Sequence, residues 1–151
     1  IGTNARITDI HGAIGLQQVK KLPSMLARRS EIAERYDRLF ADSPDVTEMT
    51  TRGEGCRNAY FFYPVLIPER DMVARMLKEE YGIDTRIAYP KPVYEQPAYA
   101  EGTAPFRRAE CPVAEEFTRR VLNLPIFPSM TDDMVDDVAG TLLKIVGTAV
   151  Q

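Results

Sequence analysis

The sequence predicts an α+β fold in which helices cover one face of a small antiparallel sheet. Segments with apolar residues at helical spacing alternate along the chain with short segments rich in aromatic and β-branched residues. The chain has 151 residues, 44% of them apolar, which is enough for one domain with its own core. No internal repeat or low-complexity tract interrupts this pattern.

Two helices are expected at the start of the chain. Thr8 is a suitable N-cap for the first helix, with Asp9 at its positive end and apolar residues recurring behind it. Pro23 is expected to end or kink this helix near Leu22, because proline lacks the N–H that a helix interior needs. A second helix, at an angle to the first, is predicted over 24–40 from an apolar stripe opposite charged residues.

The middle of the chain is expected to combine strands with one helix. Apolar spacing predicts the helix over 69–81, and Gly82 suits a left-handed C-terminal cap because it has no Cβ. Pro64 removes one strand hydrogen-bond donor and favours an edge or a bulge around it. Short strands are predicted at 46–50, 59–67 and 83–89.

The last third should begin with a loop. Residues 90–99 contain too many prolines for a helix or a central strand, so an extended loop is predicted. A helix is then predicted from Cys111 through Leu122, followed by a short extended run over 124–128. Thr131 is predicted to cap the last helix. The buried face of that helix is expected to comprise Met134, Val135, Val138, Leu142, Ile145 and Val146.

Composition excludes several classes of protein. With 19 basic and 22 acidic residues, a net charge of −3 and no basic run interleaved with aromatics, nucleic-acid binding is not expected. No apolar run is long enough to span a bilayer and no secretory pattern opens the chain, so a cytoplasmic protein without membrane contact is expected. Cys56, Cys111 and the single histidine, His11, lack the spacing of a zinc site or a disulfide framework, and the cysteines are expected to be buried thiols.

Four ordered sequence blocks carry a family resemblance. Residues 2–15 read GTNARITDIHGAIG, which is similar to the pattern G-x-N-x-R-(M/I)-x-(D/E)-I-x-A-A-x-G of the DegT/DnrJ/EryC1/StrS aminotransferases. Further blocks resemble other motifs of that family: RRSEIAERY at 28–36, the segment GIDTR…YPKP…QPAY within 82–99, and VLNLPIFPSMT at 121–131. Together they span nearly the whole chain, and the chain therefore resembles the C-terminal portion of a fold-type I enzyme of this family.

The resemblance implies a function and a domain arrangement. Family members use pyridoxal 5'-phosphate (PLP) to move an amino group, commonly from glutamate, onto keto sugars carried on nucleotides, and they are homodimers with active sites at the subunit interface. Residues 1–41 would be interdomain helices after the cofactor domain, and residues 42–151 the small C-terminal α+β domain. The family's Schiff-base lysine lies upstream of Gly2, so the chain alone is expected to be inactive. Its own lysines are expected on helix surfaces or in the proline loop: Lys20, Lys21, Lys78, Lys91 and Lys144.

The opening block supplies the first candidate site residues. The resemblance places Asn4 against the cofactor phosphate of the neighbouring subunit, a contact that an amide N–H₂ can make; the alternative is an asparagine that only caps a turn. Arg6 is a candidate for binding a nucleotide diphosphate or a substrate carboxylate through its planar fork, with a surface salt bridge as the alternative. His11 is interpreted as a polar helix residue rather than a site residue.

The proline-rich loop supplies the other candidates. Tyr89, Lys91 and Tyr94 combine flat apolar faces with a cation, as a sugar-nucleotide pocket requires, and the resemblance places this loop near the substrate. A rigid connector braced by prolines is the alternative. Asn58 and Tyr94 stand where many family members carry histidine, which leaves the substrate open. The aromatic run 60–63 is interpreted as sheet core and outer face.

Two other functions stay open at this stage. A PLP-dependent sugar dehydratase of the same fold would carry histidine in place of the upstream lysine. A non-catalytic ligand-binding or interaction module from a split gene would need no cofactor. In either enzyme, the surface that packs on the missing large domain is expected to expose an apolar patch in this chain.

Overall fold

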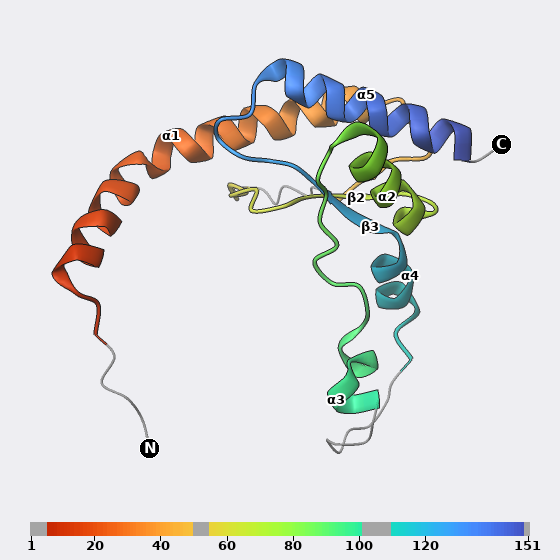
Figure 1. Ribbon diagram of the computed structural model, residues 1–151, viewed down its shortest axis with the longest axis horizontal. Helices are drawn as coiled ribbons and strands as arrows, with labels where there is room; N and C mark the ends of the chain where they lie inside the picture. The colour runs from red at the N-terminus through yellow and green to blue at the C-terminus, as the bar shows by residue number, and fades with distance from the viewer. Residues whose placement is uncertain (1–5, 50–54, 101–109, 150–151) are drawn as a thin grey trace.

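The computed structural model describes residues 6–49, 55–100 and 110–149 (Figure 1). Three helices and three strands build the fold around the core, and shorter helical segments lie in the long connection between α2 and β3. In chain order the elements are α1 (Asp9–Phe40), β1 (Thr47–Glu48), β2 (Tyr63–Leu66), α2 (Arg70–Tyr81), the 3₁₀ helix η1 (Val93–Glu95), α3 (Pro97–Ala100), α4 (Pro112–Arg120), β3 (Val121–Leu124) and α5 (Asp132–Ala149).

The sheet is antiparallel, with strand order β1-β2-β3. Val65 of β2 pairs with Leu122 of β3, and Tyr63 with Leu124, which places these apolar side chains on the same face. Every residue of β3 is buried. The α+β prediction is confirmed, although the strands are shorter than expected. The strand predicted over 83–89 is reduced to one bridge, between Arg86 and Asn123.

The core lies between the sheet and three helices. Figure 1 shows α5 running beside the second half of α1, with α2 next to them. Tyr36 of α1 packs on the strand residue Tyr63 with ring centroids 4.8 Å apart, and on Phe40 at 5.8 Å. Leu77 of α2 and Leu142 of α5 are fully buried in the same cluster. Each such side chain contributes about 1.5–3 kcal/mol by leaving water.

The two helices expected at the N-terminus form one. α1 continues through Pro23 as a single curved ribbon of 32 residues (Figure 1), so the predicted break is wrong. Proline costs the bond that its N–H would have made to the carbonyl of Val19, but its fixed φ is helical and Pro23 is exposed, so water can satisfy that carbonyl. The side chain of Ser24 also donates to the carbonyl of Lys21 at 2.8 Å.

Only the second half of α1 enters the core. Its buried residues are Ile32, Ala33, Tyr36 and Phe40. The apolar residues of the first half are 47–73% exposed: Ile10, Ile14, Leu16, Val19 and Leu22. These large apolar side chains are therefore uncovered in this chain, and their contact with a further domain stays a prediction.

The boundary between α4 and β3 differs from the prediction. The helix ends at Arg120, and Val121 and Leu122, expected in the helix, begin the fully buried strand β3. Pairing of these residues with β2 outweighs the helical spacing of their side chains. The predicted extended loop at 90–99 also contains η1 and α3, because proline is acceptable before and at the first turn of a helix.

Two smaller expectations about burial are wrong. Cys56 is exposed and Cys111 is only partly buried, because they lie in a loop and at the start of α4 rather than in the core. Met134, predicted on the buried face of α5, is 43% exposed at the edge of that face. The other residues predicted for that face are buried, and Thr131 caps the helix by accepting from the N–H of Met134 at 3.3 Å.

Candidate functional site

The segment ahead of α1 contains the first two predicted site residues. Asn4 lies outside the described residues. Arg6 is exposed, two residues before the N-cap Thr8. The hydroxyl oxygen of Thr8 accepts from the N–H of His11 at 3.4 Å and lies 2.7 Å from His11 Nδ1. The imidazole of His11 therefore belongs to the helix cap, in agreement with its interpretation as a helix residue.

The loop after α2 carries the other three predicted site residues. Tyr89 is 67% exposed, Lys91 is exposed, and Tyr94 is half-buried. The hydroxyl of Tyr94 donates a 2.6 Å hydrogen bond to Glu115 Oε1 on α4. This bond, ahead of partial burial, raises the pKa of Tyr94 to about 12. Tyr89 and Lys91 are thus open to a ligand, whereas the hydroxyl of Tyr94 already has a partner.

The structure does not bring the two groups of candidates together within one chain. In Figure 1 the start of α1 and the segment of η1 and α3 lie on separate sides of the molecule, far from each other. A single site built from both the start of α1 and the segment of η1 and α3 would therefore require a second chain.

An open hollow next to this loop contains residues that the sequence reasoning did not select. It has a volume of about 180 Å³ and its walls include Phe61, Phe62, Arg86 and Asn123. The guanidinium of Arg86 lies 5.9 Å from the ring centroid of Phe62, within reach of a cation–π contact. Asn123 is buried and its amide donates to the carbonyl of Arg86 at 2.8 Å. An asparagine within the apolar run 121–124 is the sequence signal for this contact.

A strained turn presents Phe61 at the edge of this hollow. Tyr60 has φ +47°, which is uncommon for a residue with a Cβ. Its N–H donates to Asn58 Oδ1 at 3.1 Å and its carbonyl accepts from Arg29 Nη1 at 2.5 Å. Tyr60 is buried in the core, as interpreted, while Phe61 is 74% exposed and lies ahead of β2, which begins at Tyr63, rather than on the outer face of the sheet.

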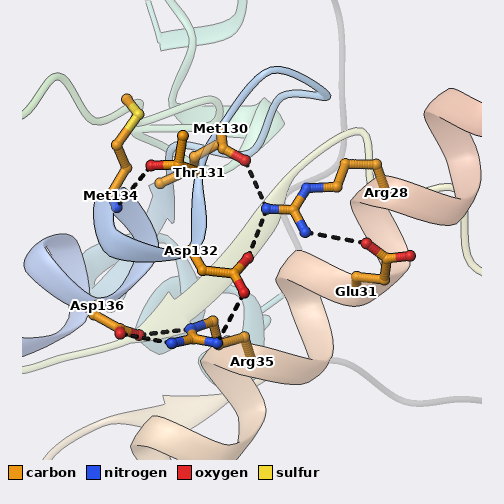
Figure 2. Close-up of polar contacts among 8 residues, drawn as sticks. All are labelled: Arg28, Glu31, Arg35, Met130, Thr131, Asp132, Met134 and Asp136. Carbon is orange, nitrogen blue, oxygen red and sulfur yellow. Dashed lines mark hydrogen bonds and ion pairs between the residues drawn. The ribbon is translucent and has the colours of Figure 1, made fainter.

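The charged cluster in Figure 2 joins α1 to the start of α5. Arg35 makes two 2.6 Å hydrogen bonds to Asp136, from Nε and from Nη2. Asp132 accepts from Arg28 at 2.7 Å and from Arg35 at 3.1 Å. These arginines hold the pKa values of Asp132 and Asp136 below their ordinary range. Every charge in this cluster is matched by a partner, so we assign it to helix packing rather than to ligand binding.

The described parts of the chain contain neither a metal site nor a membrane-spanning helix. Among residues 6–49, 55–100 and 110–149, no group of histidine, cysteine and carboxylate side chains has the arrangement of a metal site. Within the same residues, no helix has the length and apolar character needed to cross a bilayer. All five lysines are exposed, as expected.

The class of protein follows from comparison with known sequences and structures. The chain belongs to the DegT/DnrJ/EryC1/StrS aminotransferase family, whose model matches residues 1–143. It is 41% identical over 150 residues to dTDP-4-dehydro-2,3,6-trideoxy-D-glucose 4-aminotransferase of Saccharopolyspora spinosa, covering 97% of this chain and 36% of that protein.

Solved structures of aminotransferases share the fold. TlmJ from Streptoalloteichus hindustanus superimposes with a TM-score of 0.88 at 28% identity, over 99% of this chain and 39% of TlmJ. Spr1654 from Streptococcus pneumoniae, solved in its PLP form, gives a TM-score of 0.85 at 26% identity, over 97% of this chain and 37% of that one. The chain thus spans between 36% and 39% of the length of these three proteins and corresponds to the C-terminal portion of such an enzyme.

Proposed function

We propose that this chain is the C-terminal part of a PLP-dependent aminotransferase that transfers an amino group, from glutamate as donor, to a keto sugar carried on a nucleotide. The observation that carries the proposal is the family match over residues 1–143, together with 41% identity to an enzyme named for amino transfer to a dTDP-linked sugar. The solved PLP form of a structural relative supports the choice of cofactor.

The residues of this chain are suited to binding the phosphate group of PLP, and not to attaching the cofactor covalently. PLP, when bound, supplies the electron sink that lets an amino group pass between two carbonyl carbons. An amide at Asn4 and the guanidinium of Arg6 are suitable donors to phosphate or diphosphate oxygens. The resemblance places the attaching lysine upstream of Gly2, and the five lysines of this chain lie on helices or in the proline loop.

We propose further that residues 1–41 connect the cofactor domain to a small domain formed by residues 42–151. The exposed apolar residues in the first half of α1 support this assignment, because such a surface is normally covered. The separation of the start of α1 from the segment of η1 and α3 supports a homodimer, in which one subunit supplies the segment before α1 and its partner supplies the loop. Tyr89 and Lys91 then contact the sugar nucleotide.

The test uses the complete reading frame that contains this chain. The purified enzyme should retain PLP, seen by the absorbance of the bound cofactor, and should produce an amino sugar from a dTDP-linked keto sugar and glutamate. Loss of water from the sugar without amino transfer would identify the dehydratase instead. Tight PLP binding by residues 1–151 alone would overturn the assignment of the attachment point.

The role of Asn4 has its own variants. Asn4→Ala should lower PLP retention, because one donor to the phosphate is lost. Gln17→Ala, which removes an exposed amide from the surface of α1, should leave retention unchanged. Equal retention in the Asn4→Ala variant and the parent enzyme would remove Asn4 from the cofactor site.

A further inference from the structure

We propose that Glu115 is a positioning residue for substrate: through the hydroxyl of Tyr94 it fixes the loop that carries Tyr89 and Lys91. This inference rests on the proposed function for the identity of the substrate. Its structural basis is the 2.6 Å hydrogen bond between Tyr94 and Glu115 Oε1, which joins this loop to α4. A hydroxyl that donates to a carboxylate at this distance makes a strong, charge-assisted bond.

The loop is fixed at two points on one rigid segment. At its start, Arg86 exchanges backbone hydrogen bonds of 3.0 Å with Asn123 of β3 and also accepts from the Asn123 amide. Eight residues later, Tyr94 is bonded to Glu115 of α4. α4 ends at Arg120 and β3 begins at the next residue, so both fixed points belong to one continuous helix and strand whose strand part is fully buried.

The span between these two points is stiff. Pro90 and Pro92 restrict the backbone on either side of Lys91. The N–H of Glu95 donates to the carbonyl of Pro92 at 3.0 Å, which closes η1 directly behind the span. The Gln96 amide reaches back to the carbonyl of Lys91 at 3.5 Å. Because the span bends little internally, fixing Tyr94 also fixes the directions of Tyr89 and Lys91.

Neither Tyr94 nor Glu115 needs to touch the substrate for this role. The Tyr94 hydroxyl is directed to α4, whereas Tyr89 and Lys91 are exposed within the same stiff span, ahead of Tyr94. Holding such groups in place before binding lowers the cost of ordering them in the complex. The loss of Glu115 should therefore act on binding of the sugar nucleotide rather than on the step of amino transfer.

The experiment compares four single variants of the complete enzyme and the double variant Tyr94→Phe/Glu115→Ala. Glu115→Ala and Tyr94→Phe each remove one partner of the bond, and Glu115→Gln retains an acceptor oxygen. Glu116→Ala is the matched control, because Glu116 lies on the same helix but is paired with Arg119 at 2.9 Å. The readouts are kcat and KM for the sugar nucleotide, KM for glutamate, PLP content and the rate of hydrogen exchange of amides 88–99.

The expected pattern separates positioning from general damage. Glu115→Ala and Tyr94→Phe should each raise KM for the sugar nucleotide by about three- to tenfold, with kcat within about twofold of the parent. They should also speed exchange in the loop, leave KM for glutamate and PLP content unchanged, and show no additivity when combined. Glu115→Gln should restore part of the loss, and Glu116→Ala should behave as the parent.

Two outcomes would overturn the inference. In the first, the loop exchange and sugar-nucleotide KM of Glu115→Ala and Tyr94→Phe equal those of the parent. In the second, kcat and PLP content fall while that KM stays constant. Failure of the proposed function looks different: the unmutated enzyme would bind no PLP and transfer no amino group, while the exchange comparison would still report whether Glu115 holds the loop.

Discussion

Arg35 and Asp136 face each other across the contact between α1 and α5 and are joined by two parallel hydrogen bonds of 2.6 Å (Figure 2). Asp132, one turn earlier on α5, bonds to both Arg35 and Arg28. The two carboxylates thus fix the register of one helix on the other. Their geometry also makes the stability of this contact depend on pH.

The first prediction concerns the loss of thermal stability at low pH. The folded-state pKa values of Asp132 and Asp136 are lowered from 3.8, so the stability they contribute is present above that value and is lost as pH falls through the folded-state pKa values. Asp132→Asn/Asp136→Asn should lower Tm at pH 7 by no more than about 4 °C, because the paired side chains remain about a quarter to a half exposed to solvent. The difference from the parent should shrink below about pH 4 in thermal melts at several pH values.

A control separates the ion pairs from the helix dipole. Asp133 also lies in the first turn of α5 and acts on Arg35 only through the field of its charge, whereas Asp132 and Asp136 hydrogen-bond to that arginine. Asp133→Asn should therefore show a smaller loss, that of a carboxylate near a helix N-terminus and near one arginine. A fall in Tm equal to that of the double variant would mean that the arginine partners contribute nothing.

The second prediction compares two buried tyrosines. Tyr63 donates to Asp37 at 2.8 Å, a bond to a charged group, whereas Tyr36 donates to the carbonyl of Pro125 at 3.1 Å. Tyr63→Phe should lower the free energy of unfolding by about 1.5–3 kcal/mol, and Tyr36→Phe by about 1 kcal/mol. Urea unfolding measures both, and an equal or reversed order would contradict the assignment of the stronger bond to Asp37.

The third prediction uses the two ends of α2. Glu69 precedes the helix with φ +46° and Gly82 follows it with φ +67°, so both occupy the left-handed region. Glu69 is exposed and its side chain makes no cap bond, so Glu69→Gly should stabilise the chain by about 1 kcal/mol.

Gly82→Ala should have the opposite effect of similar size. A Cβ at Gly82 would meet no atom within 4 Å, which leaves backbone strain as the only cost. Chemical denaturation of both variants provides the measurement. Changes of the same sign in the two variants would show that the left-handed conformation is not what sets these energies.

The fourth prediction concerns Pro23 in the exposed half of α1. Pro23→Ala restores a backbone donor and removes a cost of up to about 3 kcal/mol, so amide exchange in residues 16–24 should slow by about ten- to a hundredfold. The far-ultraviolet signal of helix should increase. Leu22→Ala keeps every backbone donor and should leave exchange nearly unchanged, and unaltered exchange in Pro23→Ala would show that the proline does not weaken the helix.

Local signals in the sequence predicted the ends of several elements correctly. Thr8, Gly82 and Thr131 act within one helical turn of themselves, so their roles as caps could be inferred without the rest of the chain. Val121 could not be assigned locally. It continues the apolar spacing of α4, and only pairing with Leu66 of β2, distant in sequence, makes it a strand residue.

The candidate site was predictable only in part. The exposure of Tyr89 and Lys91 agrees with a role in binding, and their contact with substrate stays a prediction. The bond between Tyr94 and Glu115 joins residues 21 positions apart, and the partners of Arg28 and Arg35 on α5 lie about a hundred positions away, so no local pattern reveals them. The sequence does place Arg28 and Arg35 on one side of α1, two turns apart, and Asp132 and Asp136 on one side of α5, one turn apart, but nothing local indicates that these two sides meet.

Because α1 is continuous, a small tilt at its contact with α5 displaces its distant N-terminal end. The helix is held in the core from Ile32 onward and by the ion pairs of Arg28 and Arg35, while the 20 residues from Asp9 to Arg28 extend about 28 Å along the helix at 1.5 Å per residue. A tilt of about 5° at these ion pairs displaces the tip by about 2.5 Å, close to the length of a hydrogen bond. Asp132 and Asp136 of α5 therefore determine the position of the N-terminal end of α1, at the N-cap Thr8.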